Sequence, residues 1–222
     1  MNKYDFLIDS AKEHQKLDEY QRGNIGCFEE DGIFRGCSVA CTVYDYEMYI
    51  GSDEKCEFYD HYYLSDVLEV PRWVCHLQDS FFENVSRKKL KTFNVDFLTL
   101  MKENHHKNLD LVEPKFLLHV VQDAKKNVSE EFTQLLSAIS KAEEALQDWI
   151  DKGVPDKEKM NTEEDALELP HGTRVTNAEF AEIFVEEIVE MVKRASLASE
   201  NAEKSEKYDQ YCDKFFELVR EA

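Results

Sequence analysis

Five polar side chains in the first half of the chain have residue types that could move protons or bind a cation. Three of them fall on one predicted helix at spacings of three and four residues, so they can project from the same face. An imidazole beside two carboxylates can do acid–base work or hold a divalent cation. A solvated polar helix face is the ordinary alternative for this pattern. The five residues are His14, His61, His76, Asp79 and Glu83.

Two cysteines, Cys37 and Cys41, are a second candidate, for metal or thiol chemistry. Three residues separate them, whereas zinc prefers cysteine pairs separated by two. The remaining ligands would have to come from Cys27, Cys56, His14 or His61. A nucleophilic cysteine also needs a base and a lowered pKa, which the sequence does not show. Small neighbouring side chains favour buried thiols, so we expect neither a metal nor a cofactor.

No motif of a known catalytic family accompanies these residues. The sequence lacks a glycine-rich phosphate loop, HExxH, GxSxG and the protein-kinase motifs. We therefore assign no catalytic residue and keep enzyme activity as the alternative. That alternative is a small-molecule (nucleotide-like) binding site or hydrolase built from His14, the Gly36–Cys41 segment, His61, Asp79 and Glu83. The candidate residues of a binding protein are Arg35, Cys37, Ser38, Trp73 and His76.

Predicted helices position most of these side chains. Residues 3–20 begin with a short helix, and residues 61–68 form another. The second helix stops before Val70-Pro71, because a residue ahead of proline avoids the α region. Pro71 suits the first turn of the next helix, residues 71–85, where its missing N–H is not needed. The buried face predicted for that helix comprises Trp73, Leu77 and Phe81.

Glycine and small residues between the first helix and residue 43 predict irregular or β structure. Residues 24–43 contain an Asp-Gly pair between two short apolar runs, which indicates a hairpin. The small side chains of residues 37–41 permit close backbone packing. Residues 42–60 are rich in tyrosine and acid but have no clear period, so we expect a loop there.

The second half of the chain is predicted to be helical on both sides of a long loop. One or two short helices occupy residues 86–101, and another starts at Pro114. Residues 129–151 give the clearest amphipathic helix, which Gly153 ends. Residues 154–175 combine two prolines with many charges and read as a linker or surface loop.

The expected fold is mainly α: a helical globule with a small irregular or β-hairpin segment near residues 24–43 and a long C-terminal helix. The expected regions are an N-terminal globular region at 1–125, an amphipathic helix at 126–153, a linker or loop at 154–175 and a C-terminal helical region at 176–222.

The net charge of −20 is concentrated at both ends of the chain. Residues 1–85 hold 18 acidic and 7 basic side chains (−11), residues 86–150 hold 10 and 10 (0), and residues 151–222 hold 19 and 10 (−9). An acidic surface repels phosphate, so we expect no direct nucleic-acid binding. It can serve solubility alone, or it can steer the protein toward a basic protein partner.

The sequence contains no signal for a membrane or for secretion. No run of about 18 apolar residues predicts a membrane span, and the charged amino terminus is unlike a signal peptide. Six cysteines without a dense framework are typical of reduced thiols. We therefore expect a cytoplasmic protein that does not associate with membranes, with the C-terminal helix as a possible route to a homo-oligomer.

Three stretches together resemble a family of uncharacterised phage, prophage and bacterial proteins. The stretches are Arg35–Cys41 (RGCSVAC), Asp60–Glu83 with its PRWVCHLQDSFFE helix, and Tyr211–Arg220 (YCDKFFELVR). Members usually carry a glutamate where this chain has Arg72, so a mechanism that needs that carboxylate does not carry over. The resemblance implies a phage setting, with the bacterial host cytoplasm as the compartment, and brings no established activity. In that setting, the acidic surface and the absence of a recognised catalytic motif lead us to expect a non-catalytic binding protein that acts on a basic protein partner, as an accessory or counter-defence factor.

Overall fold

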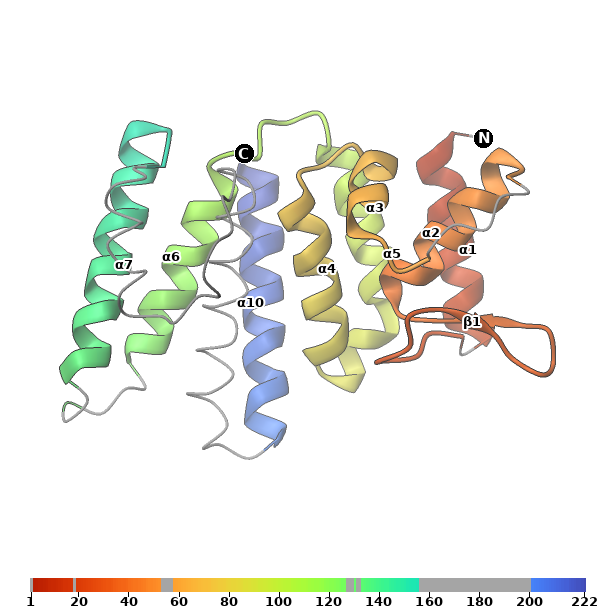
Figure 1. Cartoon of the computed structure of the whole chain (residues 1–222), viewed down its shortest axis with the longest axis horizontal. Helices are drawn as coiled ribbons and strands as arrows, with labels where there is room; N and C mark the ends of the chain where they lie inside the picture. Colours follow the sequence, from red (N-terminus) through yellow and green to blue (C-terminus); the bar gives the residue numbers. More distant parts are fainter. Residues whose placement is uncertain (1, 18, 53–57, 127–129, 131–132, 156–200) are drawn as a thin grey trace, which may run out of the picture. The chain divides into compact units, whose positions relative to one another are not determined.

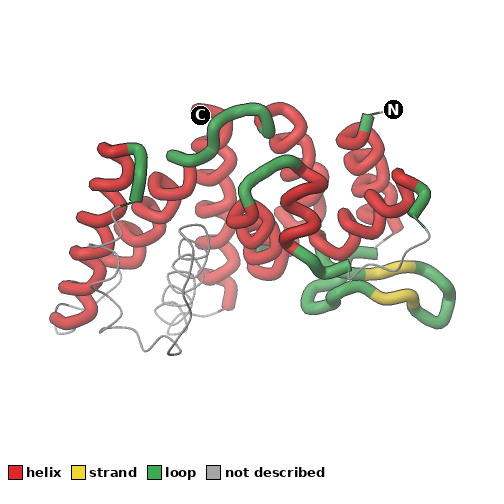
Figure 2. Tube along the Cα trace, turned by 45° about the horizontal axis from the view of Figure 1, so that its top comes forward, coloured by secondary structure: helices red, strands yellow, loops and turns green. Residues whose placement is uncertain are grey.

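The structure, a computed structural model, describes residues 2–17, 19–52, 58–126, 130, 133–155 and 201–222. In these residues the protein is mainly helical with one two-stranded hairpin, which confirms the predicted fold class (Figures 1 and 2). No helix among them is both long and apolar enough to cross a membrane.

The chain divides into two compact units. Unit 1 comprises Met1–Lys107 with Asn201–Phe216, and unit 2 comprises Asn108–Glu200 with Glu217–Ala222. The domain boundaries expected from the sequence stay a prediction. The predicted linker lies outside the described residues from position 156 onward, as does the C-terminal helical region before residue 201.

Unit 1 holds most of the elements that position the candidate residues. Helix α1 packs against α2 and α5, α2 also packs against α3 and α4, and α4 packs against α3 and α5. The elements are α1 (Lys3–Leu17), β1 (Cys27–Phe28), β2 (Phe34–Arg35), α2 (Ser38–Ile50), α3 (His61–Leu68), α4 (Arg72–Asn84), α5 (Arg87–Asn104) and the first part of α10 (Asn201–Glu221).

Helix α2 overturns one expectation, because the predicted loop at 42–60 is helical as far as Ile50. Val39, Val43 and Ile50 follow a helical spacing that the surrounding tyrosines and acids conceal. The helix ends where Gly51 adopts a left-handed conformation with φ 68° and its N–H bonds to carbonyls of the last turn. Helix α2 contacts three other helices, and even its polar Ser38 is fully buried.

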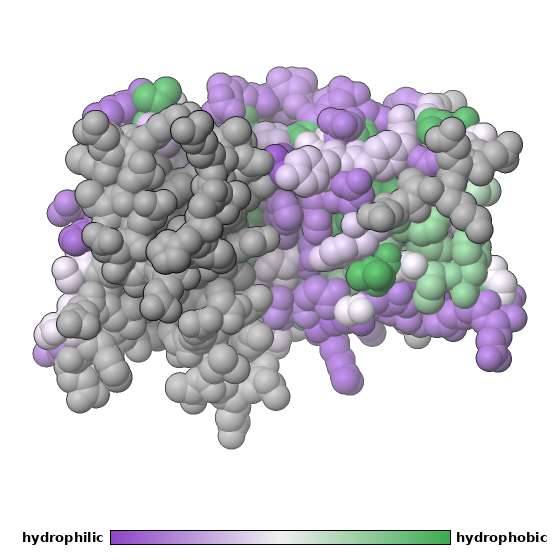
Figure 3. Space-filling view, in the orientation of Figure 1, coloured by the Kyte–Doolittle hydropathy of each residue, from purple (hydrophilic) through white to green (hydrophobic). Residues whose placement is uncertain are grey.

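The hairpin lies where the sequence predicts it, with β1 antiparallel to β2 and Phe28 opposite Phe34. Its base approaches α2 so closely that a Cβ on Gly36 would lie 2.9 Å from the Cβ of Ala40. A Cβ on Gly26, which has φ +100°, would lie 2.7 Å from the Phe34 ring. Both positions therefore need glycine. Figure 3 shows hydrophobic surface, in green, over the part of unit 1 that contains the hairpin and α2.

The turn between α3 and α4 lies at Val70-Pro71, where the sequence predicts it. Asp60 caps α3 by accepting hydrogen bonds from two backbone N–H groups, and Glu69 ends it with φ 55°. The predicted face of α4 is buried in the core. Phenylalanines of α4, α5 and α10 form its centre: Phe81, Phe82, Phe93, Phe97 and Phe215.

Helix α10 joins unit 1 by a specific polar contact as well as by its aromatic rings. Ser86 is the N-cap of α5, and its side chain accepts a hydrogen bond from the N–H of Lys89. The backbone N–H and the hydroxyl of Ser86 both donate to the Asp209 carboxylate, at 2.8 and 2.7 Å. A carboxylate at this position also interacts favourably with the positive end of the α5 dipole.

Unit 2 contains α6 (Val112–Lys125) and α7 (Thr133–Lys152), which pack against each other. Both helices were predicted, and Gly153 ends α7 as expected, with φ 73°. Buried apolar residues from both helices, including Phe116, Leu117, Leu146 and Trp149, form its core.

Replacing Asp209 by alanine should lower the free energy of unfolding of unit 1 by about 1–2 kcal/mol, because Ser86 loses both acceptors at a helix cap. Urea unfolding followed by Trp73 fluorescence, in a Trp149→Phe background, measures this. Asp213→Ala is the matched control, since Asp213 pairs with Lys89 from a side chain that is 71% exposed. Its effect should stay within about 0.5 kcal/mol. Equal effects of the two substitutions would show that the Ser86 contact is not stabilising.

Candidate functional site

The five residues singled out from the sequence do not converge on one site. His14 belongs to a group of three, the His14 cluster, with Glu19 and Asp45. His61, His76 and Asp79 meet in a second group, the His61 cluster, together with Tyr59 and Cys37. Glu83 lies one turn farther along α4. Both ring nitrogens of His14 bond within its own cluster.

In the His14 cluster, one imidazole lies between two carboxylates. Its Nδ1 is 2.5 Å from Oε2 of Glu19, and its Nε2 is 2.9 Å from Oδ1 of Asp45. All three residues are buried, with exposed fractions of 6–8%. An ionised carboxylate only accepts hydrogen bonds, so both ring nitrogens must donate. The geometry therefore requires His14 to be an imidazolium cation when both acids are ionised.

The electrostatics agree with this assignment. Burial acts to lower the pKa of His14, but hydrogen bonds and charge from Asp45 and Glu19 outweigh it and raise the pKa above its ordinary value. Burial raises the pKa of Asp45, and the nearby His14 partly opposes that rise. A buried cation flanked by two carboxylates is stable only as a set, because removal of one member leaves the others without compensation.

Local backbone bonds bring the three side chains together. The N–H of Glu19 donates to the His14 carbonyl at 3.0 Å, which turns the chain back at the end of α1. The carbonyl of Glu19 then accepts from Gly36 at the base of the hairpin, and Asp45 extends from α2. The His14 cluster thus ties α1, the hairpin and α2 to one another. With both ring nitrogens engaged, His14 cannot serve as a general base.

A buried polar network adjoins this cluster. The Tyr20 ring lies 5.5 Å from the His14 ring, and the Tyr20 hydroxyl accepts a hydrogen bond from Asn94 at 2.6 Å. Asn94 accepts in turn from Gln78 at 2.8 Å and donates to Thr42 at 3.3 Å. These contacts link α5 to α4 and α2 in the interior of unit 1.

The His61 cluster is built on ring stacking. The His61 and His76 rings lie nearly parallel, with centroids 4.2 Å apart and 16° between their planes. The Tyr59 ring meets His61 edge-on at 4.9 Å, and its hydroxyl donates to Oδ2 of Asp79 at 2.7 Å. Nε2 of His61 is 3.8 Å from that same oxygen. The first residue of α3 therefore stands against two residues of α4.

Titration in this cluster favours a neutral imidazole beside an ionised acid. Burial, then the charge of His61, lowers the pKa of His76 to about 4. Burial acts to raise the pKa of Asp79, but the nearby His61 imidazole and the hydrogen bond from Tyr59 outweigh it and lower that pKa. Burial raises the pKa of Cys37 to about 12, so this sulfur remains a thiol at neutral pH and is no ready nucleophile.

Two atoms of this cluster lack a hydrogen-bond partner although they are buried: Nε2 of His61 and Oδ1 of Asp79. Buried polar atoms are ordinarily satisfied, by protein or by water. A donor group that reaches Asp79 and a polar atom that reaches His61 would complete them. Among the described residues, no group of three or more histidine, cysteine, aspartate and glutamate side chains is arranged to hold a metal ion.

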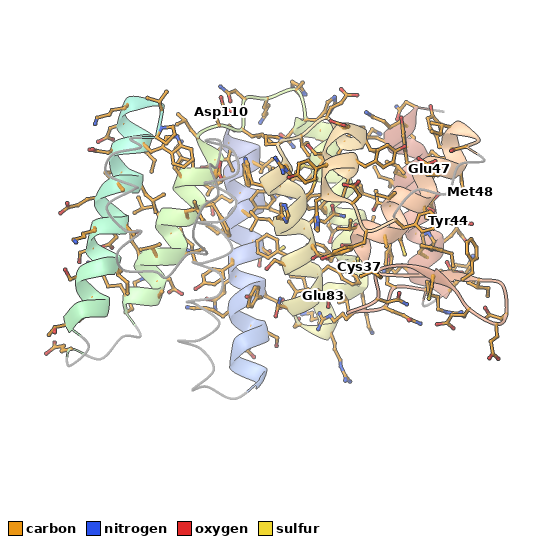
Figure 4. The ribbon with its side chains drawn as sticks, viewed as in Figure 1. Cys37, Tyr44, Glu47, Met48, Glu83 and Asp110 are labelled. Atoms are coloured by element: carbon orange, nitrogen blue, oxygen red, sulfur yellow. The ribbon has the colours of Figure 1, made fainter. Side chains whose placement is uncertain are left out.

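Glu83 has a different task. Both of its carboxylate oxygens accept from the N–H of Gly23, at 2.9 and 3.0 Å, and burial raises its pKa. Arg22 beside it donates to the carbonyls of Phe82 and Val85 at the end of α4. Glu83 thus holds the loop that leads into the hairpin. Figure 4 shows Glu83 and Cys37 on the side of unit 1 where the hairpin joins α2.

The residues proposed for binding lie in different environments. Arg35 pairs with Glu29 and Asp31 on the hairpin. Cys37 and Ser38 are buried at the start of α2, and the Ser38 hydroxyl has no hydrogen-bond partner. Trp73 is buried with its ring edge toward Phe215 at 6.0 Å, and His76 is half-buried against His61.

Sequence reasoning missed Glu19, Asp45 and Tyr59. Asp45 lies in a segment for which the sequence predicts a loop, although the helical spacing of Val39 and Val43 is a signal for the helix that forms there. Glu19 follows His14 by five residues, a spacing that helix geometry does not bring together. Nothing in the sequence pairs Tyr59 with Asp79, since their contact depends on how α3 meets α4.

Replacing His14 by glutamine should lower the free energy of unfolding at pH 6 by about 3–5 kcal/mol, because two buried carboxylates lose their cation. The gap between wild type and variant should shrink as pH rises. The raised pKa of His14 means that its stabilisation is complete below about pH 6.5. That stabilisation is lost as pH rises through the folded-state value. Urea unfolding at pH 6, 7.5 and 9, followed by Trp73 fluorescence in the Trp149→Phe background, measures the gap.

The control for His14 is Lys12→Gln, which breaks an exposed pair with Asp9. It should change the free energy of unfolding by less than about 0.5 kcal/mol at every pH. A His14 gap that is the same at pH 6 and pH 9 would show that the folded protein holds a neutral imidazole.

Comparison of the chain with protein-family models, with curated proteins and with solved structures found no match. The His14 cluster ties elements of unit 1 together, and the His61 cluster keeps two unsatisfied polar atoms.

Proposed function

We propose that the protein is a non-catalytic binding protein whose acidic surface docks on a basic protein partner. One observation carries the proposal: the described cations of the most acidic segment, residues 1–85, are all engaged within the chain. Carboxylates outnumber lysine and arginine there by 18 to 7. Charge that would neutralise the excess must come from outside this segment.

Each of the six described lysine and arginine side chains in this segment has an internal partner. Four form ion pairs, one donates to backbone carbonyls and one covers an aromatic ring. The contacts are Lys3 with Glu69, Lys12 with Asp9, Lys16 with Glu13, Arg35 with Glu29 and Asp31, Arg22 with the carbonyls of Phe82 and Val85, and Arg72 over the Tyr62 ring at 3.5 Å.

Carboxylates remain at the surface after this pairing. Glu30 on the hairpin and Asp66 on α3 are exposed, and neither has an ion-pair partner in the described part of the chain. Exposed charge of one sign attracts a partner of the opposite sign and speeds the encounter. Small counterions can also neutralise it, and that is the outcome against which the proposal is tested.

The buried titratable groups support a binding role over catalysis. Both ring nitrogens of His14 are committed to carboxylates. Burial raises the pKa of both Cys37 and Cys41, which disfavours the thiolate that nucleophilic catalysis needs. In the phage setting that the resemblance implies, the proposed role is that of an accessory or counter-defence factor in the bacterial cytoplasm.

A synthetic lysine–serine peptide should bind the full chain, and its dissociation constant should rise about tenfold or more between 50 and 300 mM salt, because screening weakens contacts between exposed charges. Isothermal titration calorimetry measures this. A glutamate–serine peptide of the same length is the control and should show no binding. A dissociation constant for the lysine peptide that is independent of salt, or no binding at 50 mM salt, would contradict the proposal.

The alternative is a small-molecule site, for a nucleotide-like ligand, at the His61 cluster. The observation in its favour is the pair of unsatisfied buried atoms, Nε2 of His61 and Oδ1 of Asp79. An ionised Asp79 would accept from a ligand N–H or O–H group. Glu83 is less suited to this role because Gly23 occupies both of its oxygens.

For the alternative, a nucleotide that binds should raise the melting temperature of the wild type but not of Asp79→Asn. Asparagine keeps an oxygen that can accept from Tyr59 but replaces the charged acceptor by an amide. A thermal-shift panel of purine and pyrimidine nucleotides measures this, with the exposed Asp66→Asn as the matched control. If no nucleotide raises the melting temperature, or if Asp79→Asn responds like the wild type, the alternative is wrong.

A further inference from the structure

The hairpin and α2 present an exposed apolar surface that the core does not use. Phe28 is 57% exposed and Met48 is 59% exposed, although both are large apolar side chains. We call the surface around them the hairpin patch: the exposed Phe28 and Met48 and the half-buried Tyr44 and Phe58, with the buried Phe34 beneath them. Single exposed apolar residues are common, but a contiguous group of them marks an interaction surface.

Contacts between aromatic rings hold the side chains of the patch in place. The Phe28 ring lies 5.4 Å from Phe34 and 5.7 Å from Tyr44, and Phe34 stacks on Tyr44 at 4.2 Å with 12° between the planes. Phe58 meets both Phe34 and Tyr44 edge-on. Met48 follows Tyr44 by one helical turn and so lies on the same side of α2 (Figure 4).

The support beneath the patch is close-packed. Phe34 is buried, with an exposed fraction of 4%, and rests against Gly26, where any Cβ would overlap its ring. The His14 cluster fixes α2 and the base of the hairpin, so both elements that make the patch are anchored. A surface positioned in advance binds with a smaller loss of conformational entropy.

Acidic groups border the patch. Glu29, Glu30 and Asp31 follow Phe28 directly, and Arg35 pairs with the first and third of them. Glu30 is exposed and has no ion-pair partner in the described residues. In Figure 3, hydrophilic surface, in purple, lies directly below the hydrophobic area.

We propose that the hairpin patch is the docking surface for a basic, amphipathic segment of a protein partner. Its apolar side chains would pack on Phe28 and Met48, while its lysine or arginine side chains would face the carboxylates of the hairpin. Methionine adapts to varied apolar surfaces, and aromatic faces also accept cationic side chains. This inference rests on the proposed function and assigns it a surface.

The test compares two synthetic peptides with the same number of lysines. One has leucines three and four residues apart, so that they share one helix face, and the other has serine in place of each leucine. Calorimetry on the full chain should show that the leucine peptide binds at least about tenfold more tightly, because its apolar side chains are buried on the patch. Phe28→Ser combined with Met48→Ser should remove that advantage and leave the affinity for the serine peptide within about twofold.

Leu17→Ser is the matched control, because Leu17 is exposed to the same extent as Phe28 but lies on α1 outside the patch. It should leave both affinities unchanged. Glu30→Gln should weaken binding of both peptides, whereas Asp66→Asn on α3 should not. If Phe28→Ser prevents folding, Met48→Ser alone carries the test, since Met48 sits on the exposed side of α2 and should still reduce the advantage of the leucine peptide.

The outcomes separate this inference from the function on which it rests. Salt-dependent binding of both peptides with no leucine advantage, or an advantage that survives the double substitution, would overturn the patch and leave the basic-partner proposal in place. Failure of both peptides to bind at 50 mM salt would overturn the two together. Loss of the advantage in Leu17→Ser would also count against the patch, by placing the apolar contact elsewhere.

Discussion

The cation of His14, held between two buried carboxylates, is the interaction on which the arrangement of unit 1 depends. Its partners come from the turn after α1 and from α2, so one side chain fixes three segments. Any shift of α1 against α2 would leave a buried charge without its partner, which disfavours other arrangements of these segments. The hairpin inherits this constraint through the hydrogen bond between Gly36 and Glu19.

Much of the fold followed from the sequence because helix period and helix ends are local properties. The face of α4 with Trp73, Leu77 and Phe81, the stop before Pro71 and the hairpin at the Asp-Gly pair all depend on neighbours within a few positions. Helix α2 was not predicted because it packs against three helices and buries polar as well as apolar side chains. The apolar residues therefore do not follow a clear helical period in the sequence. The polar residues that obscured it are the ones that hold unit 1 together.

The candidate site was predictable only in part. The spacing of His76, Asp79 and Glu83 on one helix was correct, and Asp79 does meet His61 and His76. Which neighbour each side chain selects depends on the angle between helices and on loop paths, which residue spacing does not specify. Glu83 therefore turned toward the backbone of Gly23, while Asp79 turned toward Tyr59. The apolar exposure of Phe28 and Met48 was likewise invisible, because burial is a property of the assembled unit.

The contact between Ser86 and Asp209 spans 123 residues of sequence, so it cannot form until late in synthesis of the chain. A ribosome that adds roughly 5–20 residues per second needs about 6–25 seconds to pass from the first of these residues to the second. During that interval the aromatic core formed by the phenylalanines of α4 and α5 is incomplete, because Phe215 of α10 has not yet been synthesised. Contacts between residues far apart in sequence slow folding. Until they form, the apolar surface of the nascent chain is exposed and can associate with other chains. The acidic segment of residues 1–85, already outside the ribosome, would keep such incomplete chains apart by mutual repulsion.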